Sequence, residues 1–119
     1  MLFRSFIRGG AGNDVISTFA GQDLVRGGSG SDSIDLGAGS DTLFYTTDQV
    51  VTGDSDTLTA FTSGEDHLVF DKGIDTTLVF SGGDDTSGYT KITFTAGGQT
   101  SSLNVVSGAI KKTDITFIT

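Results

Sequence analysis

The first part of the chain repeats one pattern of apolar and polar positions with a period of nine residues. Four contiguous blocks, GGAGNDVIS, TFAGQDLVR, GGSGSDSID and LGAGSDTLF, run from Gly9 to Phe44. Each block has a turn-forming half that ends in Asp, followed by three residues with an apolar side chain at their centre. Because strand side chains alternate between two faces, those three residues predict a short strand with one inward side chain. The inward series is Ile7, Ile16, Val25, Ile34 and Leu43.

Two blocks make one flattened coil, so residues eighteen apart lie above one another in a parallel roll. Stacked strands are roughly 4.8 Å apart. Asp14 therefore stacks with Asp32 along one edge, and Asp23 stacks with Asp41 along the other. Two unpaired carboxylates at that distance repel by about 3 kcal/mol at an effective dielectric of about 20. A cation between them removes this repulsion, so the pattern predicts a metal site at each edge.

The ligands available in these turns favour calcium. Every donor is an oxygen, from an Asp carboxylate or a backbone carbonyl. The chain has no Cys and one His, so zinc and copper sites lack their usual ligands. Hard oxygen ligands in a wide, flexible turn suit Ca²⁺ better than Mg²⁺, which requires a tighter octahedron.

The four blocks resemble the RTX (repeats-in-toxin) nonapeptide repeats of secreted bacterial proteins. The resemblance implies an all-β fold, a calcium-bound parallel β-roll with a β-rich C-terminal cap. It also implies about two regular calcium sites and leaves room for more, each shared by two stacked turns that supply one Asp and alternate carbonyls. The implied ligands of the first site are Gly9, Gly10, Gly12, Asp14, Gly27, Gly28, Gly30 and Asp32. Those of the second are Thr18, Ala20, Gly21, Asp23, Leu36, Gly37, Gly39 and Asp41.

The second site departs from the family pattern, which has glycines where this chain has Thr18, Phe19 and Leu36. A carbonyl ligand can come from any residue, but a Phe is expected to resist a positive φ angle. We therefore expect the second site to be weaker than the first, or distorted.

Beyond Phe44 the nine-residue register decays, although an Asp-x-apolar step recurs at Asp56 and again at Asp66. These steps predict degenerate turns that continue the roll for about one coil. Asp54, Asp56 and Asp66 are candidates for a further calcium site, and solvated turn carboxylates are the alternative interpretation. The stretch 56–71 is similar to the segment that closes the C-terminal domain of serralysin-like metalloproteases.

The C-terminal part has no repeat, and it predicts a β-rich cap over the open end of the roll. Gly-rich loops at 81–88 and 96–99 predict hairpins. The expected strands cover residues 77–80, 89–95, 102–106 and 115–118. We thus divide one continuous domain into a roll, residues 1–71, and a capping and secretion-signal region, residues 72–119.

Composition narrows the possible partners. Fifteen acidic against seven basic residues give a net charge of −8, which argues against nucleic acid and anionic membranes. The chain has eighteen glycines, so burial of apolar side chains alone does not readily offset the conformational entropy that is lost on folding. Calcium binding is therefore expected to stabilise the fold. No apolar run reaches membrane-spanning length, which predicts no membrane insertion.

Arg8 and Arg26 lie eighteen residues apart, so they are expected to stack on one outer face of the roll, in contact with solvent.

The sequence carries no H-E-x-x-H motif, nucleophile elbow or phosphate loop, so the chain itself is not expected to be an enzyme. The resemblance implies a module that folds on Ca²⁺ after type I secretion, as the C-terminal part of a larger exported bacterial protein. Any catalytic domain would lie upstream. The alternative is a structural or adhesive end module of a surface adhesin or surface-layer protein. In both cases we expect a secreted or cell-surface monomer, exported by the type I machinery through an uncleaved C-terminal signal at 114–119.

Overall fold

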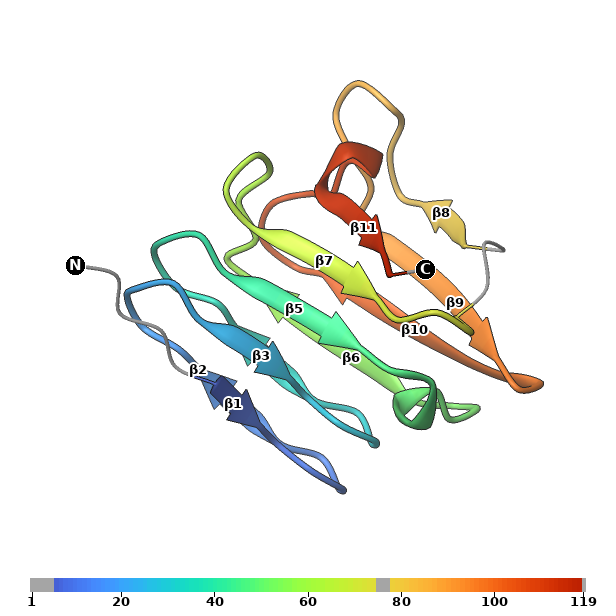
Figure 1. The fold of residues 1–119 in the computed structure, drawn as a ribbon. Helices are drawn as coiled ribbons and strands as arrows, with labels where there is room; N and C mark the ends of the chain where they lie inside the picture. Colours follow the sequence, from blue (N-terminus) through green and yellow to red (C-terminus); the bar gives the residue numbers. More distant parts are fainter. Residues whose placement is uncertain (1–5, 75–77, 119) are drawn as a thin grey trace.

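Each nine-residue block folds into a turn and a short strand, and successive strands enter two facing sheets in alternation (Figure 1). The structure is a computed structural model that describes residues 6–74 and 78–118. The first sheet contains Phe6–Arg8 (β1), Leu24–Arg26 (β3), Thr42–Tyr45 (β5), His67–Phe70 (β7) and Ile115–Phe117 (β11). The second sheet contains Val15–Ser17 (β2), Ser33–Asp35 (β4), Ser55–Thr59 (β6), Val79–Ser81 (β8), Lys91–Ala96 (β9) and Gln99–Val105 (β10).

Helical structure within the described residues is limited to two 3₁₀ turns, Thr47–Gln49 (η1) and Lys112–Asp114 (η2). No helix in these parts of the chain is long and apolar enough to cross a membrane.

The pairing of the repeat strands is parallel, as predicted. The strand order is β1-β3-β5-β7-β11 in the first sheet and β2-β4-β6-β10-β9-β8 in the second. Partners in the regular part lie eighteen residues apart, for example Ile7 with Val25 and Ile16 with Ile34. The predicted fold class, an all-β parallel roll, is confirmed.

The inward apolar residues form two columns that meet in one core. In the first sheet the column is Ile7, Val25, Leu43, Leu68 and Ile115. In the second sheet it is Ile16, Ile34, Leu58 and Val105. Most of these side chains are fully buried, and all of them belong to or pack against a single cluster. The apolar residues that recur every nine positions therefore form the core, and the turns between them lie at the edges of the two sheets.

The degenerate turns continue the roll for one coil, as the Asp-x-apolar steps predicted. β6 pairs in parallel with β4, and β7 pairs in parallel with β5. The register joins Ile34 to Leu58 and Leu43 to Leu68, which are 24 and 25 residues apart. Relative to the nine-residue blocks, six residues are therefore inserted between Leu43 and Leu58 and one more between Leu58 and Leu68. η1 lies in the six-residue insertion.

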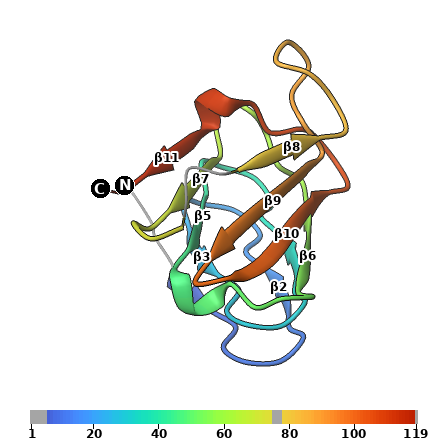
Figure 2. The same cartoon turned by 90° about the vertical axis from the view of Figure 1, so that its right-hand side faces the viewer.

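The C-terminal part closes the stack, as Figure 2 shows with β8, β9 and β10 across the near end. β8, β9 and β10 form the two predicted antiparallel hairpins, although Thr77 of the first predicted strand lies outside the described residues. β10 also pairs in parallel with β6, and β11 pairs in parallel with β7. Both sheets of the roll are thus extended by the C-terminal part of the chain, and the strand expected near Ile115 is present.

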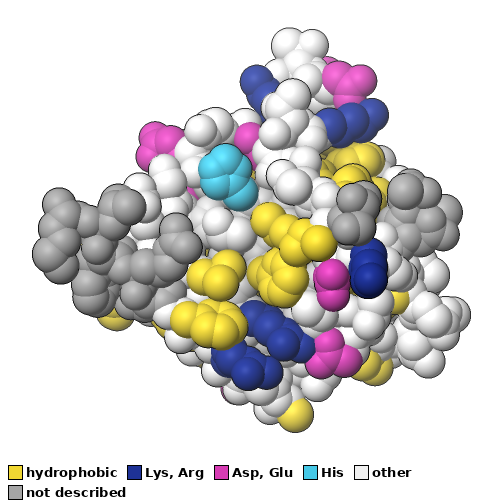
Figure 3. Space-filling model, in the orientation of Figure 1, with side chains coloured by type: hydrophobic (Ala, Val, Ile, Leu, Met, Phe, Trp, Pro, Cys, Tyr) yellow, Lys and Arg dark blue, Asp and Glu magenta, His cyan; other side chains and the backbone are white. Residues whose placement is uncertain are grey.

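The outer face of the first sheet is not uniformly polar. One outward column runs in register through Arg8, Arg26, Phe44 and Val69. Figure 3 faces this side and shows apolar and basic side chains gathered near its middle. The net negative charge of the chain is therefore unevenly distributed, since the aspartates of the repeats lie at the edges of the sheets.

Candidate metal centre

The aspartates of the first edge stack where the turns lead into β2, β4 and β6. The backbone amide of Asp14 donates a hydrogen bond to Oδ1 of Asp32 at 2.9 Å. The amide of Asp32 donates in the same way to Oδ1 of Asp56 at 2.8 Å. One repeated hydrogen bond therefore joins three consecutive coils along this edge.

The second edge has the same arrangement. The amide of Asp23 donates to Oδ1 of Asp41 at 2.9 Å, and the amide of Asp41 donates to Oδ1 of Asp66 at 2.9 Å. The structure thus brings together both pairs of aspartates that the nine-residue spacing placed in register. It also adds a third aspartate to each column.

The second carboxylate oxygen distinguishes the regular turns. Oδ2 is buried in Asp14, Asp32 and Asp41, and none of these three atoms accepts a hydrogen bond from the described residues. Burying an acceptor, above all a charged one, without a partner is costly. A cation bound beside these atoms would supply the missing interaction, and hard carboxylate oxygens suit calcium.

The stacked turns also form a cradle of the right size. A Cβ atom built on Gly9 would lie 2.5 Å from the carbonyl oxygen of Gly27 and 2.7 Å from Oδ2 of Asp14. Oxygens from two stacked turns therefore face a common point, at distances close to the roughly 2.3–2.6 Å of calcium ligands. The carbonyl oxygens of Gly10 and Gly12 point at the backbone of the turn stacked on them. A Cβ atom built on Gly28 would lie 2.0 Å from the first of these oxygens, and one built on Gly30 would lie 2.1 Å from the second. The residues present at the first site fit calcium.

The second site keeps this backbone despite its departures from the pattern. Phe19 has a φ of 65°, so the expectation that it resists a positive φ is wrong. Its side chain points outward, 77% exposed, while its carbonyl accepts a hydrogen bond from the Ala38 amide at 2.7 Å. A left-handed conformation of such a residue costs about 1–2 kcal/mol, and the surrounding turn holds it in place.

Side chains occupy part of the second cradle. Leu36 is fully buried in the core, and the hydroxyl of Thr18 donates to the Leu36 carbonyl oxygen at 2.5 Å. The Leu36 carbonyl, which was expected to be a calcium ligand, is therefore already hydrogen-bonded. This supports the expectation that the second site is the weaker of the two.

Sequence comparison agrees with the geometry. A family model described as "RTX calcium-binding nonapeptide repeat (4 copies)" matches residues 4–34 and 17–46. The chain carries RTX calcium-binding repeats. RTX nonapeptide repeats bind Ca²⁺, so calcium is the metal of these turns. No curated protein matches the chain.

Two solved structures share the fold of this RTX roll, both repeat subunits of the mannuronan C5-epimerase of Azotobacter vinelandii. The AlgE6R3 subunit has a TM-score of 0.68 and 20% identity, over 98% of this chain and 74% of that one. The AlgE6R2 subunit has a TM-score of 0.55 and 20% identity, over 92% of both chains. At this identity the similarity establishes the fold alone.

The three additional aspartates of the RTX roll differ from those of the regular turns. Asp56 and Asp66 are buried, so they are not solvated turn carboxylates. Oδ2 of Asp56 accepts from the Tyr45 hydroxyl at 2.7 Å, and Oδ2 of Asp66 accepts from the Thr62 amide at 2.8 Å. Oδ2 of Asp54 accepts from the Gly30 amide at 2.8 Å. The sequence analysis did not predict that Tyr45 is a hydrogen-bond partner of Asp56. The one indication in the sequence was an aromatic residue with a hydroxyl group two positions after the inward Leu43.

Burial makes the stacked carboxyls weak acids in the metal-free protein. It raises the pKa of Asp32 to about 6, with the nearby carboxylates of Asp56 and Asp14 adding to the shift. It likewise raises the pKa of Asp41 to about 6, with the Asp66 and Asp23 carboxylates adding to it. No group of three or more His, Cys, Asp and Glu side chains within the described residues is placed to hold a metal ion.

Calcium-free protein should be more folded at pH 5 than at pH 7.5. The folded pKa of Asp32 and Asp41, about 6, exceeds the unfolded value of about 4. The folded state therefore holds extra protons between these values, and its stability falls as pH rises through that window. With calcium the order should reverse, because protons compete for the same carboxylates. Circular dichroism of calcium-depleted protein and calcium titrations at both pH values measure this. A calcium midpoint independent of pH would contradict it.

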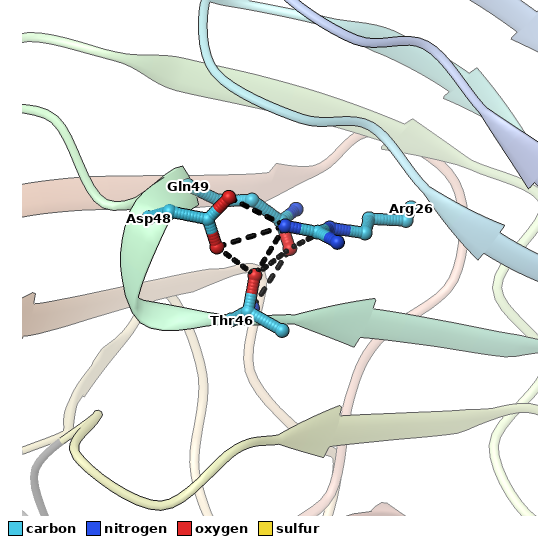
Figure 4. A network of polar contacts seen from close by, with 4 residues as sticks. All are labelled: Arg26, Thr46, Asp48 and Gln49. Carbon is cyan, nitrogen blue, oxygen red and sulfur yellow. Dashed lines mark hydrogen bonds and ion pairs between the residues drawn. The ribbon is translucent and has the colours of Figure 1, made fainter.

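A polar network ties the regular repeats to the third coil (Figure 4). Arg26 donates from Nε to Oε1 of Gln49 at 2.9 Å, and from Nη2 to Oγ1 of Thr46 at 2.6 Å. Its Nη2 also binds both carboxylate oxygens of Asp48, at 2.6 and 2.8 Å. The expectation that Arg26 is solvated is therefore wrong, since its side chain is 18% exposed, whereas Arg8 is exposed as expected. The insertion that contains η1 is anchored on a strand of the RTX repeats.

Proposed function

We propose that this chain is a calcium-dependent folding module of an exported bacterial protein. Its regular turns stay open at the low calcium concentration of the cytosol and close around Ca²⁺ outside the cell. The regular repeats then leave the cell unfolded by the type I route and fold on arrival. It acts through binding and folding, and any catalytic step would belong to a domain upstream.

The observation that carries this proposal is the set of buried Oδ2 atoms at Asp14, Asp32 and Asp41 that accept no hydrogen bond from the described residues. The folded roll forces these carboxylates together, away from water. Without a cation the arrangement opposes folding, and with one it becomes a set of ligands. Folding and calcium binding are thus parts of one equilibrium.

The position of the proposed export signal supports the same order of events. The carboxylate of Asp114 is 5% exposed and accepts hydrogen bonds from the Ser63 hydroxyl at 2.7 Å and from the Gly64 amide at 3.0 Å. The residues that follow it form β11. The signal is accessible in the unfolded chain and is incorporated into the first sheet when β11 pairs with β7.

The second candidate is an adhesive or surface-layer end module. It is supported by the placement of β1 and β11 at opposite edges of the first sheet, since a roll connected through its two ends can extend a longer chain. Both candidates require calcium-dependent folding. Fusion of the chain to a cargo in a type I secretion strain separates them, because only the first candidate requires export to depend on residues 114–119.

Added calcium should fold the chelated chain. In chelator, the far-ultraviolet β signal of the regular repeats should be low and the radius expanded. Ca²⁺ at about 10⁻⁴–10⁻³ M, the range of extracellular calcium sites, should restore both, and Mg²⁺ should be far less effective. Full β content of residues 9–45 in excess chelator would overturn the proposal.

A matched pair of variants connects that transition to the first site. Asp32→Asn keeps an oxygen that can accept the Asp14 amide but removes the buried charge, so it should raise the calcium midpoint several-fold. Asp35→Asn removes the same charge from an exposed carboxylate, whose Oδ1 accepts the Gly37 amide in a local turn. It should leave the midpoint nearly unchanged. Equal midpoints for the two variants would refute the assignment of Asp32.

A further inference from the structure

The aspartate of the third coil on the first edge repeats one hydrogen bond of the regular turns and differs from them at its other oxygen. Oδ1 of Asp56 accepts the Asp32 amide at 2.8 Å, just as Oδ1 of Asp32 accepts the Asp14 amide at 2.9 Å. By this equivalence, Oδ2 of Asp56 corresponds to the Oδ2 atoms of Asp14 and Asp32 that accept no hydrogen bond from the described residues. In Asp56, however, that oxygen accepts a hydrogen bond from Tyr45 at 2.7 Å.

The Tyr45 hydroxyl is held in place by the core. Tyr45 is 1% exposed and crosses from β5 of the first sheet to the start of β6 in the second. Its ring stacks on Phe70 with centroids 5.7 Å apart and tilts against Phe94 at 4.8 Å. A buried phenol needs a hydrogen-bond partner, and burial raises the pKa of Tyr45 well above its usual value, so the hydroxyl remains a donor.

The second edge ends in a comparable way. Oδ1 of Asp66 accepts the Asp41 amide at 2.9 Å, and its Oδ2 accepts the Thr62 amide at 2.8 Å. In the third coil, both oxygens of each buried carboxylate thus accept a hydrogen bond from the protein. In the regular coils, Asp32 and Asp41 each keep a buried oxygen without one among the described residues.

We propose that the Tyr45 hydroxyl takes the place of the cation at the third coil, ends the calcium column of the first edge there, and lets β6 fold without calcium. The inference rests on the proposed calcium-dependent folding of the regular turns, and it divides the chain into two parts. The turns that contain Asp14 and Asp32 require Ca²⁺, while the coil that contains Asp56 provides the calcium-independent surface on which they assemble.

Hydrogen exchange in chelator, with and without calcium, tests this division. In the wild type, the amides of Asp56 and Leu58 in β6, which pairs with β10, should be protected in chelator. The amides of Ser55 and Thr57 donate to Ser31 and Asp32 of the second coil, so they should gain protection only with calcium, as should those of Ser33–Asp35. Tyr45→Phe keeps the ring and removes the donor, so the amides of Asp56 and Leu58 should exchange at least about tenfold faster in chelator, the effect expected for losing a hydrogen bond to a buried charge. Added calcium should restore their protection.

Two further variants keep the result interpretable. Tyr89→Phe removes a hydroxyl that donates to the exposed Asp85, and it should leave the pattern unchanged. If Tyr45→Phe does not fold even with calcium, Tyr45→Phe combined with Asp56→Asn removes the uncompensated charge and should restore protection of the same two β6 amides. Failure of that rescue would overturn the inference, as would unchanged protection of those two amides in Tyr45→Phe, or wild-type protection of them that needs calcium as β4 does. Protection of β4 in chelator would instead overturn the proposed function.

Discussion

A chain that ends at Asp71 should not fold when calcium is added, although it keeps every regular repeat. The truncation removes β10, which pairs with β6, and β11, which pairs with β7, so both sheets of the third coil become open edges. It also removes Phe94, whose ring lies 4.8 Å from Tyr45 and 5.2 Å from Phe70. Each coil of a repeat protein is stabilised mainly by its neighbours, and the regular coils would have no formed neighbour on which to assemble.

A calcium titration followed by circular dichroism measures this effect. The truncated chain should show no transition at calcium concentrations about ten times the wild-type midpoint. The control removes two strands from the opposite end. A chain that begins at Thr18 loses β1 and β2 but keeps β6 to β11 and should still fold, with less calcium bound. A normal midpoint after loss of residues 72–119 would show that the C-terminal strands do not support the roll.

Gly28→Ala should abolish folding of the first calcium site, whereas Gly10→Ala should only weaken it. Both glycines have a positive φ, 95° and 86°, so both substitutions carry a similar backbone strain of about 1–2 kcal/mol. A Cβ on Gly28 would lie 2.0 Å from the carbonyl oxygen of Gly10, whereas a Cβ on Gly10 would have nothing within 4 Å. Only the first substitution therefore forces the stacked turns apart and separates the oxygens that face the metal.

Calcium titrations of the two variants measure the difference. Gly10→Ala should raise the midpoint by about five- to thirtyfold, as its strain alone requires. Gly28→Ala should raise the midpoint by much more than that, or remove the transition of the first coil. Since the two positions have the same backbone conformation, equal midpoints would mean that the close stacking of the turns does not determine calcium binding.

The regular coils could be predicted from the sequence because each coil repeats both its core residue and its turn. Ile34 and Asp32 have counterparts eighteen residues before them, and that spacing alone determined their partners. The insertions before Leu58 and Leu68 changed the spacing to 24 and 25 residues. Even so, the Asp-x-apolar step still indicated a further coil, because an inward side chain two residues after an Asp is a local feature.

The remaining features depend on neighbours that are distant in the sequence. The parallel pairing of β10 with β6 joins residues 47 apart, and no local pattern specifies a partner at that distance. Phe19 was expected to resist a positive φ angle, but the surrounding backbone imposes the left-handed conformation on it. Arg26 looked like a surface residue because its partners Asp48 and Gln49 lie in an insertion outside the repeat.

The stacking direction of the roll also determines how it responds to force. Since β1 and β11 lie at opposite edges of the first sheet, tension between the two ends acts along the interstrand hydrogen bonds and peels coils away in sequence. The outermost coil, with three-residue strands, resists least. Each eighteen-residue coil that detaches would lengthen the chain by about 60 Å and release its share of the bound metal. The module would therefore extend stepwise under load, with a stiffness set by the calcium concentration around it.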